Sequence, residues 1–129
     1  MVSEKEIRQR AKKVLKNYDK YKRIAGKDDS LKSVVLSDMP KNVSRVNYNE
    51  NRLINRIDAQ NILQSISEAL EMLDSEHKEL LERIYIYQKH KTQLYIADMM
   101  GWSIKSLERH HALALVEFAE AYHYEDLLF

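Results

Sequence analysis

The chain has 129 residues, the length of a single domain or of a small domain with an added arm. It contains two glycines, one proline and no cysteine, a composition that favours an all-α fold and excludes disulfides, thiolate metal ligands and a cysteine nucleophile. No apolar stretch approaches the roughly 18 residues of a membrane span, and the polar N-terminus lacks the apolar region of a signal peptide. A cytoplasmic protein with no membrane partner is therefore expected.

The net charge of +1 conceals an uneven distribution. Residues 1–27 hold ten lysines and arginines against three acids, and residues 83–112 hold five against two. Residues 58–82 carry seven acids and one base, and residues 113–129 carry four acids and neither lysine nor arginine. Because phosphate neutralisation is local, the two basic blocks are compatible with nucleic-acid binding, although charge alone does not establish it.

In chain order, residues 4–25 are predicted to form one helix, within a basic N-terminal helix or arm that covers residues 1–27. Apolar side chains recur along it at alternating spacings of three and four, at Ile7, Ala11, Val14, Tyr18, Tyr21 and Ala25. Three readings of this stripe stay open. It can dock on the chain's own helices, form a homodimer, or leave the helix as an arm that contacts phosphates.

Residues 28–49 hold the only proline and a cluster of Asp, Ser and Asn, which predicts a connector loop. Helix is expected to resume near Glu50, and residues 50–129 are interpreted as a helical DNA-binding domain. The apolar side of its first helix would be formed by Leu53, Ile57, Ile62, Ile66, Leu70 and Leu73, with a slip near Asn61. Asp74 or Ser75 should cap the next helix, which would run to about Gln88.

Residues 92–115, TQLYIADMMGWSIKSLERHHALAL, are the most informative stretch. A short helix begins at Thr92, a turn follows at Gly101, and a longer helix is capped by Ser103. Two helices that cross steeply need a small residue at their contact, which Ala97 supplies, and Gly101 tolerates the positive φ of the turn. These features predict a helix-turn-helix. The residues expected to hold it together are Ile96, Ala97, Gly101, Leu107, Ala114 and Leu115.

The second helix of such a motif enters the DNA major groove. Arg109 suits a bidentate contact with guanine, Glu108 can accept a hydrogen bond from cytosine, and Lys105 can reach guanine or phosphate. The alternative is a solvated or protein-binding face. The predicted DNA-binding residues are Ser103, Lys105, Ser106, Glu108 and Arg109, with Lys89 and Lys91 as backbone clamps before the motif.

No catalytic, cofactor or metal site is predicted. The neighbours His110 and His111 project about 100° apart on a helix and cannot easily share one metal ion. The other histidines show no ligand spacing with them. A Gly-rich phosphate loop and a Ser/His/Asp arrangement in context are both missing, so an enzyme is not expected. His111 is interpreted as a packed or phosphate-adjacent side chain, and Trp102 as a hydrophobic plug.

The stretch IADMMGWSIKSLERHHALAL is similar to region 4 of sigma-70-type factors, whose helix-turn-helix ends in an Ala-Leu pair that matches Ala114-Leu115. The whole chain resembles more closely the ArpU/RinA-type regulators of phages and prophages in Gram-positive bacteria. The segments that carry this resemblance are YDKYKRIAG, LSDMPKN, NYNENRL and the C-terminal FAEAY. Two positions depart from the sigma-like pattern, because His110 stands where an aliphatic residue is usual and Ile104 where a polar contact is frequent.

The resemblance implies a late-gene transcription regulator, an activator of packaging or lysis genes, whose partners are double-stranded DNA and RNA polymerase. By the same resemblance, Lys105, Glu108 and Arg109 match base-reading positions. Two other functions stay open. One is a DNA-packaging protein like a terminase small subunit, which assembles into rings. The other is a module that docks on polymerase through Glu117 and Glu120 without reading DNA.

Overall fold

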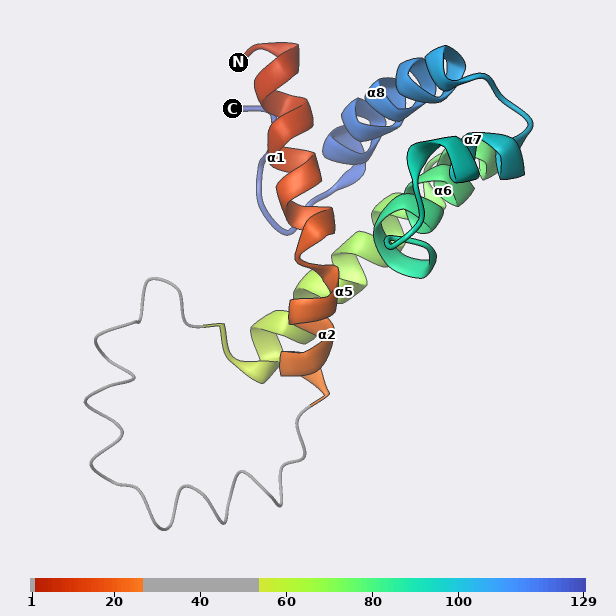
Figure 1. Ribbon diagram of the computed structural model, residues 1–129. Helices are drawn as coiled ribbons and strands as arrows, with labels where there is room; N and C mark the ends of the chain where they lie inside the picture. The colour runs from red at the N-terminus through yellow and green to blue at the C-terminus, as the bar shows by residue number, and fades with distance from the viewer. Residues whose placement is uncertain (1, 27–53) are drawn as a thin grey trace, which may run out of the picture.

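The computed structural model describes residues 2–26 and 54–129, and every regular element within these two ranges is helical. The expected all-α fold is therefore confirmed for the described residues. The helices are α1 (Glu4–Lys16), α2 (Tyr18–Ala25), α5 (Arg56–Glu71), α6 (Ser75–Glu82), the π-helical turn η1 (Arg83–Tyr87), α7 (Gln93–Met100) and α8 (Ile104–Ala121) (Figure 1). The predicted connector at residues 28–49 lies outside the described residues, as do its Met-Pro and Asn-Glu motifs.

The prediction of one continuous helix over residues 4–25 was wrong, because the helix breaks at Asn17. The backbone of Asn17 leaves the helical region with φ −90° and ψ 9°, and its N–H donates to the carbonyl of Val14 at 3.2 Å. Its side-chain amide donates to the carbonyl of Lys13 at 3.0 Å and so competes with the helical pattern. The break lets α1 pack against α8 while α2 turns away to pack against α5.

Helix α5 begins later than the sequence predicts. Glu50 lies outside the described residues, Ile54 and Asn55 are non-helical, and the Asn55 side chain caps the helix by accepting from the N–H of Asp58 at 2.8 Å. Ile57, which was placed in the apolar stripe, sits in the first turn and is 62% exposed. The slip at Asn61, which the sequence allows as a kink or as a wide apolar face, falls within one helix. One uninterrupted helix buries a wide face made of Ala59, Ile62, Ser65, Ile66, Ala69 and Leu70.

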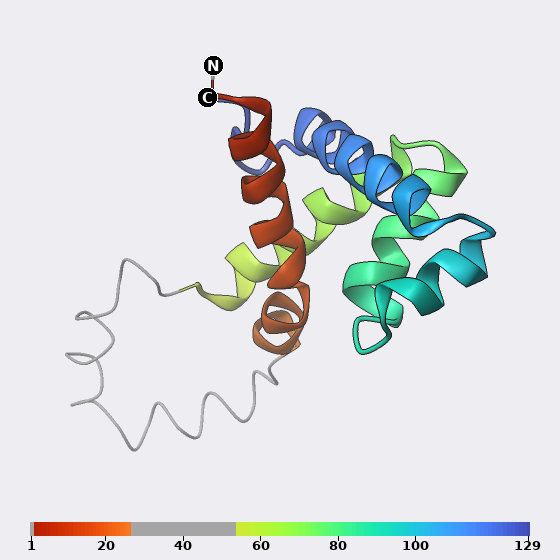
Figure 2. The same cartoon turned by 45° about the horizontal axis from the view of Figure 1, so that its top comes forward.

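The main core lies where α1, α5 and α8 meet, around the fully buried side chains of Leu15, Ile66 and Phe118. The docking of the N-terminal stripe on the chain's own helices is thus what the structure shows. Beyond α8 the C-terminal tail runs back along α1, and its Leu127 is buried in the same core. The N–H of Val2 donates to the carbonyl of Leu128 at 3.2 Å, so the two termini lie side by side (Figures 1 and 2).

A second, smaller core joins α6, α7 and α8. Leu80, Ile96, Ala97 and Leu107 are its buried members, and Trp102 packs against it at the turn. Asp74 is the cap of α6, since its carboxylate accepts from the N–H of His77 at 2.8 Å. Of the helices described here, none has both the length and the apolar character needed to cross a membrane.

Candidate nucleic-acid interface

The turn between α7 and α8 is closed by a glycine in the left-handed conformation. Gly101 has φ 76° and ψ 28°. The N–H of Trp102 donates to the carbonyl of Ala97 at 2.8 Å, and the N–H of Gly101 donates to the carbonyl of Asp98 at 3.1 Å. This pair of bonds is the Schellman pattern, which satisfies the last free carbonyls of a helix. The turn is therefore specified by its backbone as well as by packing.

Both helices that flank the turn begin at a hydroxyl cap. The Oγ1 of Thr92 accepts from the N–H of Tyr95 at 3.1 Å, and the Oγ of Ser103 accepts from the N–H of Ser106 at 3.1 Å. Only three residues, 101–103, separate the end of α7 from the start of α8. The hydroxyl of Ser103 is occupied in capping.

One face of the α7–α8 unit is packed. Ile96, Ala97 and Leu107 belong to the smaller core, where the small side chain of Ala97 lets the helices approach closely. Ala114 and Leu115, about two turns beyond Leu107 on α8, belong to the main core. The two cores therefore hold the whole inner side of α8.

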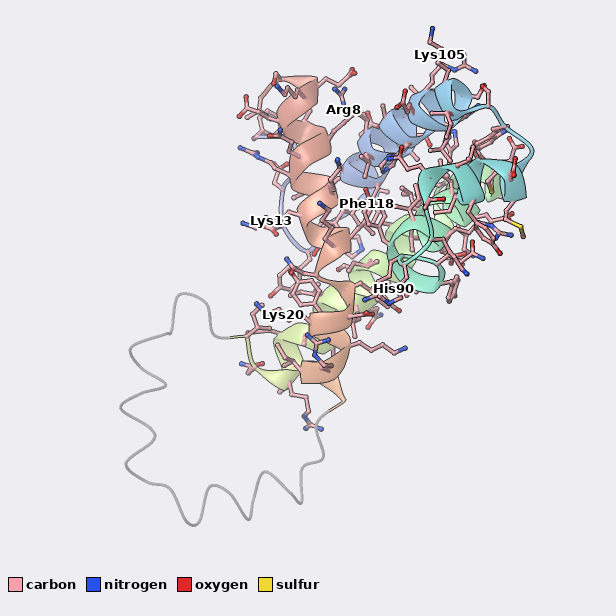
Figure 3. The ribbon with its side chains drawn as sticks, viewed as in Figure 1. Arg8, Lys13, Lys20, His90, Lys105 and Phe118 are labelled. Atoms are coloured by element: carbon pink, nitrogen blue, oxygen red, sulfur yellow. The ribbon has the colours of Figure 1, made fainter. Side chains whose placement is uncertain are left out.

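The opposite face of α8 is free of packing over its first two turns. Lys105, Glu108 and Arg109 are exposed, and Ser106 is half-buried. Positions 105, 108, 109 and 112 follow helical spacing and share one face. Figure 3 shows Lys105 at the free tip of α8, projecting away from the body of the molecule. This face offers two cations and one carboxylate at spacings suited to base edges and phosphates.

Lys89 and Lys91 do not lie beside that face. The Nζ of Lys89 forms an ion pair with Asp19 of α2. The Nζ of Lys91 lies 4.9 Å from the ring centroid of Tyr95, in a cation–π contact. His90, which stands between them, is well separated from Lys105 in Figure 3. Lys89 therefore ties the segment before α7 to α2.

A hydrogen-bonded histidine network joins α8 to α6, and the sequence analysis did not predict it. His77 of α6 is 6% exposed. Its Nδ1 lies 2.7 Å from Oε1 of Glu117, and its Nε2 lies 3.0 Å from Nδ1 of His110. His110 in turn stacks on Trp102, with ring centroids 4.2 Å apart and planes inclined by 12°. His110 departs from the sigma-like pattern because here it bonds to α6 instead of filling an apolar seat.

His111 faces a different neighbour. Its Nε2 lies 2.6 Å from the hydroxyl of Tyr85 in η1. Burial, and secondarily the ammonium of Lys12 on α1, lowers the pKa of His111 to about 4. The ring is consequently neutral at pH 7 and shares a hydrogen bond with the Tyr85 hydroxyl. Of the two sequence readings, the packed side chain is the one that the geometry favours.

Asp74, His77 and Glu117 are the described residues that come nearest to a metal-ligand cluster, with ligand atoms within 4.8 Å of one another. The side chains of these residues already have hydrogen-bond partners within the cluster. Asp74 caps the backbone of His77, and Glu117 accepts from its ring. The arrangement fits an internal hydrogen-bond network, in which each polar group has its partner.

A basic groove lies between α1 and α8. Lys5, Arg8 and Lys12 line it from α1, and Glu108 and Ala112 line it from α8. It adjoins the exposed face of α8, because Glu108 borders both. The sequence could show that α1 is basic, but only the packed structure shows which of its cations stand next to α8.

The helices and their packing define an all-α protein with an N-terminal basic helix docked beside an exposed helix face. The chain is 32% identical over 119 residues to the ArpU protein of Enterococcus hirae, which is described as an autolysin regulatory protein. That match spans 92% of this chain and 87% of the relative. The chain therefore belongs to the ArpU family. No family model matches it, and no solved structure shows significant similarity to it.

Proposed function

We propose that this chain is a sequence-specific DNA-binding transcriptional regulator in which α7, the turn at Gly101 and α8 act as a helix-turn-helix. The observation that carries the proposal is the division of α8 into two faces. Its inner side is packed into both cores, whereas Lys105, Glu108 and Arg109 stand exposed on the first two turns. A helix held in this way can enter a major groove without losing any packing.

The membership in the ArpU family supports a regulatory role. The name of the Enterococcus hirae relative connects that protein with autolysin regulation, which fits a regulator of lysis or packaging genes. The resemblance to phage late-gene regulators extends the proposal to activation of such genes in a phage or prophage, with RNA polymerase as a second partner. The exposed Glu120 and the half-buried Glu117, which lie towards the C-terminal end of α8 and away from its basic tip, are candidates for that contact.

The test is selection of binding sites from a random duplex pool at fixed salt, with the Arg109→Ala variant alongside. A guanine contact by Arg109 predicts that the variant binds the enriched duplex more weakly by about 1–3 kcal/mol and loses discrimination at one base pair. Arg23→Ala is the matched control, because it removes the same charge from an exposed position on α2. Arg23→Ala should keep both the affinity and the base preference.

Failure of the selection would contradict the proposal. If the wild-type chain enriches no motif, α8 does not read sequence. If a motif is enriched but Arg109→Ala behaves as wild type, the recognition face is wrong. The mass in solution separates the alternative role in DNA packaging, since rings of many subunits favour a terminase-like assembly and a monomer or dimer favours the regulator.

A further inference from the structure

Basic residues of α1 and α2 lie on two sides of these helices that the packing separates. Lys5, Arg8 and Lys12 line the groove next to α8, whereas Lys13 and Lys20 do not. Figure 3 shows Arg8 on the side of α1 toward α8, and Lys13 and Lys20 on the opposite side of α1 and α2. The first set follows helical spacing and makes one ridge along α1. That ridge runs beside the part of α8 that contains Glu108 and Ala112.

The ridge is held in a fixed position relative to α8. Ile7, Ala11 and Leu15 of α1 are buried in the main core with α8. On another side of α1, the guanidinium of Arg10 donates to the carbonyls of Leu127 and Phe129 in the C-terminal tail. A helix anchored on two sides does not behave as a loose arm. Its exposed cations are therefore presented at a constant distance from the face of α8.

One lysine of the ridge lies close enough to α8 for its charge to act on a side chain of that helix. The ammonium of Lys12 is one of the two causes that lower the pKa of His111 in α8. Arg8 is partly committed, since its Nη1 donates to Glu4 at 2.9 Å. Lys5 is exposed and Lys12 is half-buried, with a long side chain that can reach the rim. These two lysines are the cations of the ridge best placed to bind an anion.

A duplex that accepts α8 in its major groove brings phosphates to both sides of that helix, because a helix occupies most of the roughly 12 Å width of the groove. On the side of α1, the first basic surface that a phosphate strand meets is the ridge. The carboxylate of Glu108 borders the same groove. It repels phosphates from the α8 wall and directs them toward α1. The charges of the groove therefore fit a phosphate strand lying along α1.

We propose that Lys5 and Lys12 bind the phosphate backbone of the strand that flanks the major groove entered by α8. This inference rests on the proposed function and gives the N-terminal helix a part in it. The contact is independent of sequence and fixes how the recognition helix is seated. It also replaces Lys89, whose ammonium is paired with Asp19, as the backbone clamp.

The experiment compares two double variants that remove the same charge. Lys5→Gln/Lys12→Gln removes both lysines of the ridge and keeps Arg8, whereas Lys13→Gln/Lys20→Gln removes two cations of α1 and α2 from outside the ridge. Affinity for the selected duplex and for a random-sequence duplex is measured across a salt series. Each lost phosphate contact lowers the slope of log K against log salt by about 0.9, so the ridge variant should lose up to ~2 units of slope. Both duplexes should be affected alike.

The expected result is a weaker affinity and a shallower slope for the ridge variant, with the control variant close to wild type. Equal losses in both double variants would overturn the proposal, because the effect would then come from total charge. An unchanged ridge variant would overturn it too, and the proposed function would stand if Arg109→Ala still lost the motif. A wild-type chain that binds neither duplex would defeat the proposed function itself. Circular dichroism of each variant checks that the helices are intact.

Discussion

The imidazole rings of His77 on α6 and His110 on α8 are in contact between the two helices. Nε2 of His77 lies 3.0 Å from Nδ1 of His110, and the ring planes are inclined at 64°. In its neutral form His77 donates from Nδ1 to Glu117, which leaves Nε2 to accept from His110. Because His110 also stacks on Trp102, this one contact links α6 and α8 to the turn between α7 and α8. The order of the turn should depend on it.

Replacing His110 by alanine should loosen the turn. His110→Ala leaves Nε2 of the buried His77 without its partner and removes the ring that covers Trp102, at a cost of about 1–3 kcal/mol in the free energy of unfolding. Trp102 is the only tryptophan of the chain, so its fluorescence reports the change directly. A red shift of the emission is expected, together with a lower midpoint in urea.

His90→Ala is the control for that measurement, because His90 is exposed in the segment before α7. It should change neither the emission nor the midpoint. Identical behaviour of the two variants would show that the network does not hold the turn.

The lowered pKa of His111 predicts a loss of stability in acid. The folded chain holds His111 neutral down to about pH 4, whereas the unfolded chain binds a proton near pH 6.5. Between these values the unfolded state carries the extra proton, so the free energy of unfolding falls with falling pH by up to about 1.4 kcal/mol per unit. Above about pH 6.5 His111 is neutral in both states, and the free energy of unfolding no longer depends on its titration. His111→Gln, which keeps a hydrogen-bonding group for Tyr85, should flatten this part of the profile.

A direct NMR titration of His111 gives a second readout. Burial is the main cause of the lowered pKa, and the charge of Lys12 is the second. Lys12→Gln should therefore raise the pKa of His111 toward its ordinary value, while Lys13→Gln should leave it unchanged. A His111 that titrates near pH 6.5 in the wild-type chain would contradict the packing described for it.

Gly101 should resist substitution by residues other than asparagine. Its φ of 76° is costly for any residue with a Cβ, although the space around an added Cβ is open. Gly101→Ala is therefore expected to lose about 1–2 kcal/mol of unfolding free energy through backbone strain alone. Gly101→Asn should lose less, since asparagine tolerates this region. Urea denaturation of both variants measures the difference, and equal stabilities would mean that the turn relaxes to another conformation.

The local signals of the sequence predicted three helix starts correctly. Asp74, Thr92 and Ser103 all cap helices through their side chains, as their residue types indicated. Each boundary depends on contacts within three residues, which a sequence displays directly. The break at Asn17 was missed because the apolar stripe continues through it without a change of period. The bond from the Asn17 side chain to the carbonyl of Lys13 interrupts the helix, and the packing of α1 and α2 against different helices goes with that break.

The candidate interface was predictable only in part. The outward position of Lys105, Glu108 and Arg109 follows from the inward position of Leu107, and periodicity is enough to find it. The histidine network could not be found in this way, because His77 and His110 are 33 residues apart and neither has a ligand-like spacing. His110 and Glu117 are seven residues apart on α8 and therefore lie on the same side of that helix. This spacing was the one signal in the sequence that pointed to the network. The partner from α6 appears only once the helices are packed.

The C-terminal tail should contribute to stability through one side chain and not through its length. Leu127 is 4% exposed in the main core, whereas Phe129 is 68% exposed. Leu127→Ala should lower the free energy of unfolding by about 2–4 kcal/mol, because it removes buried methyl groups and leaves a cavity. Phe129→Ala, which keeps the backbone carbonyl that Arg10 binds, should change it by less than about 0.5 kcal/mol. If thermal and urea denaturation show equal losses for the two variants, the tail is not packed on α1, and the support that it gives to the basic ridge beside α8 is absent.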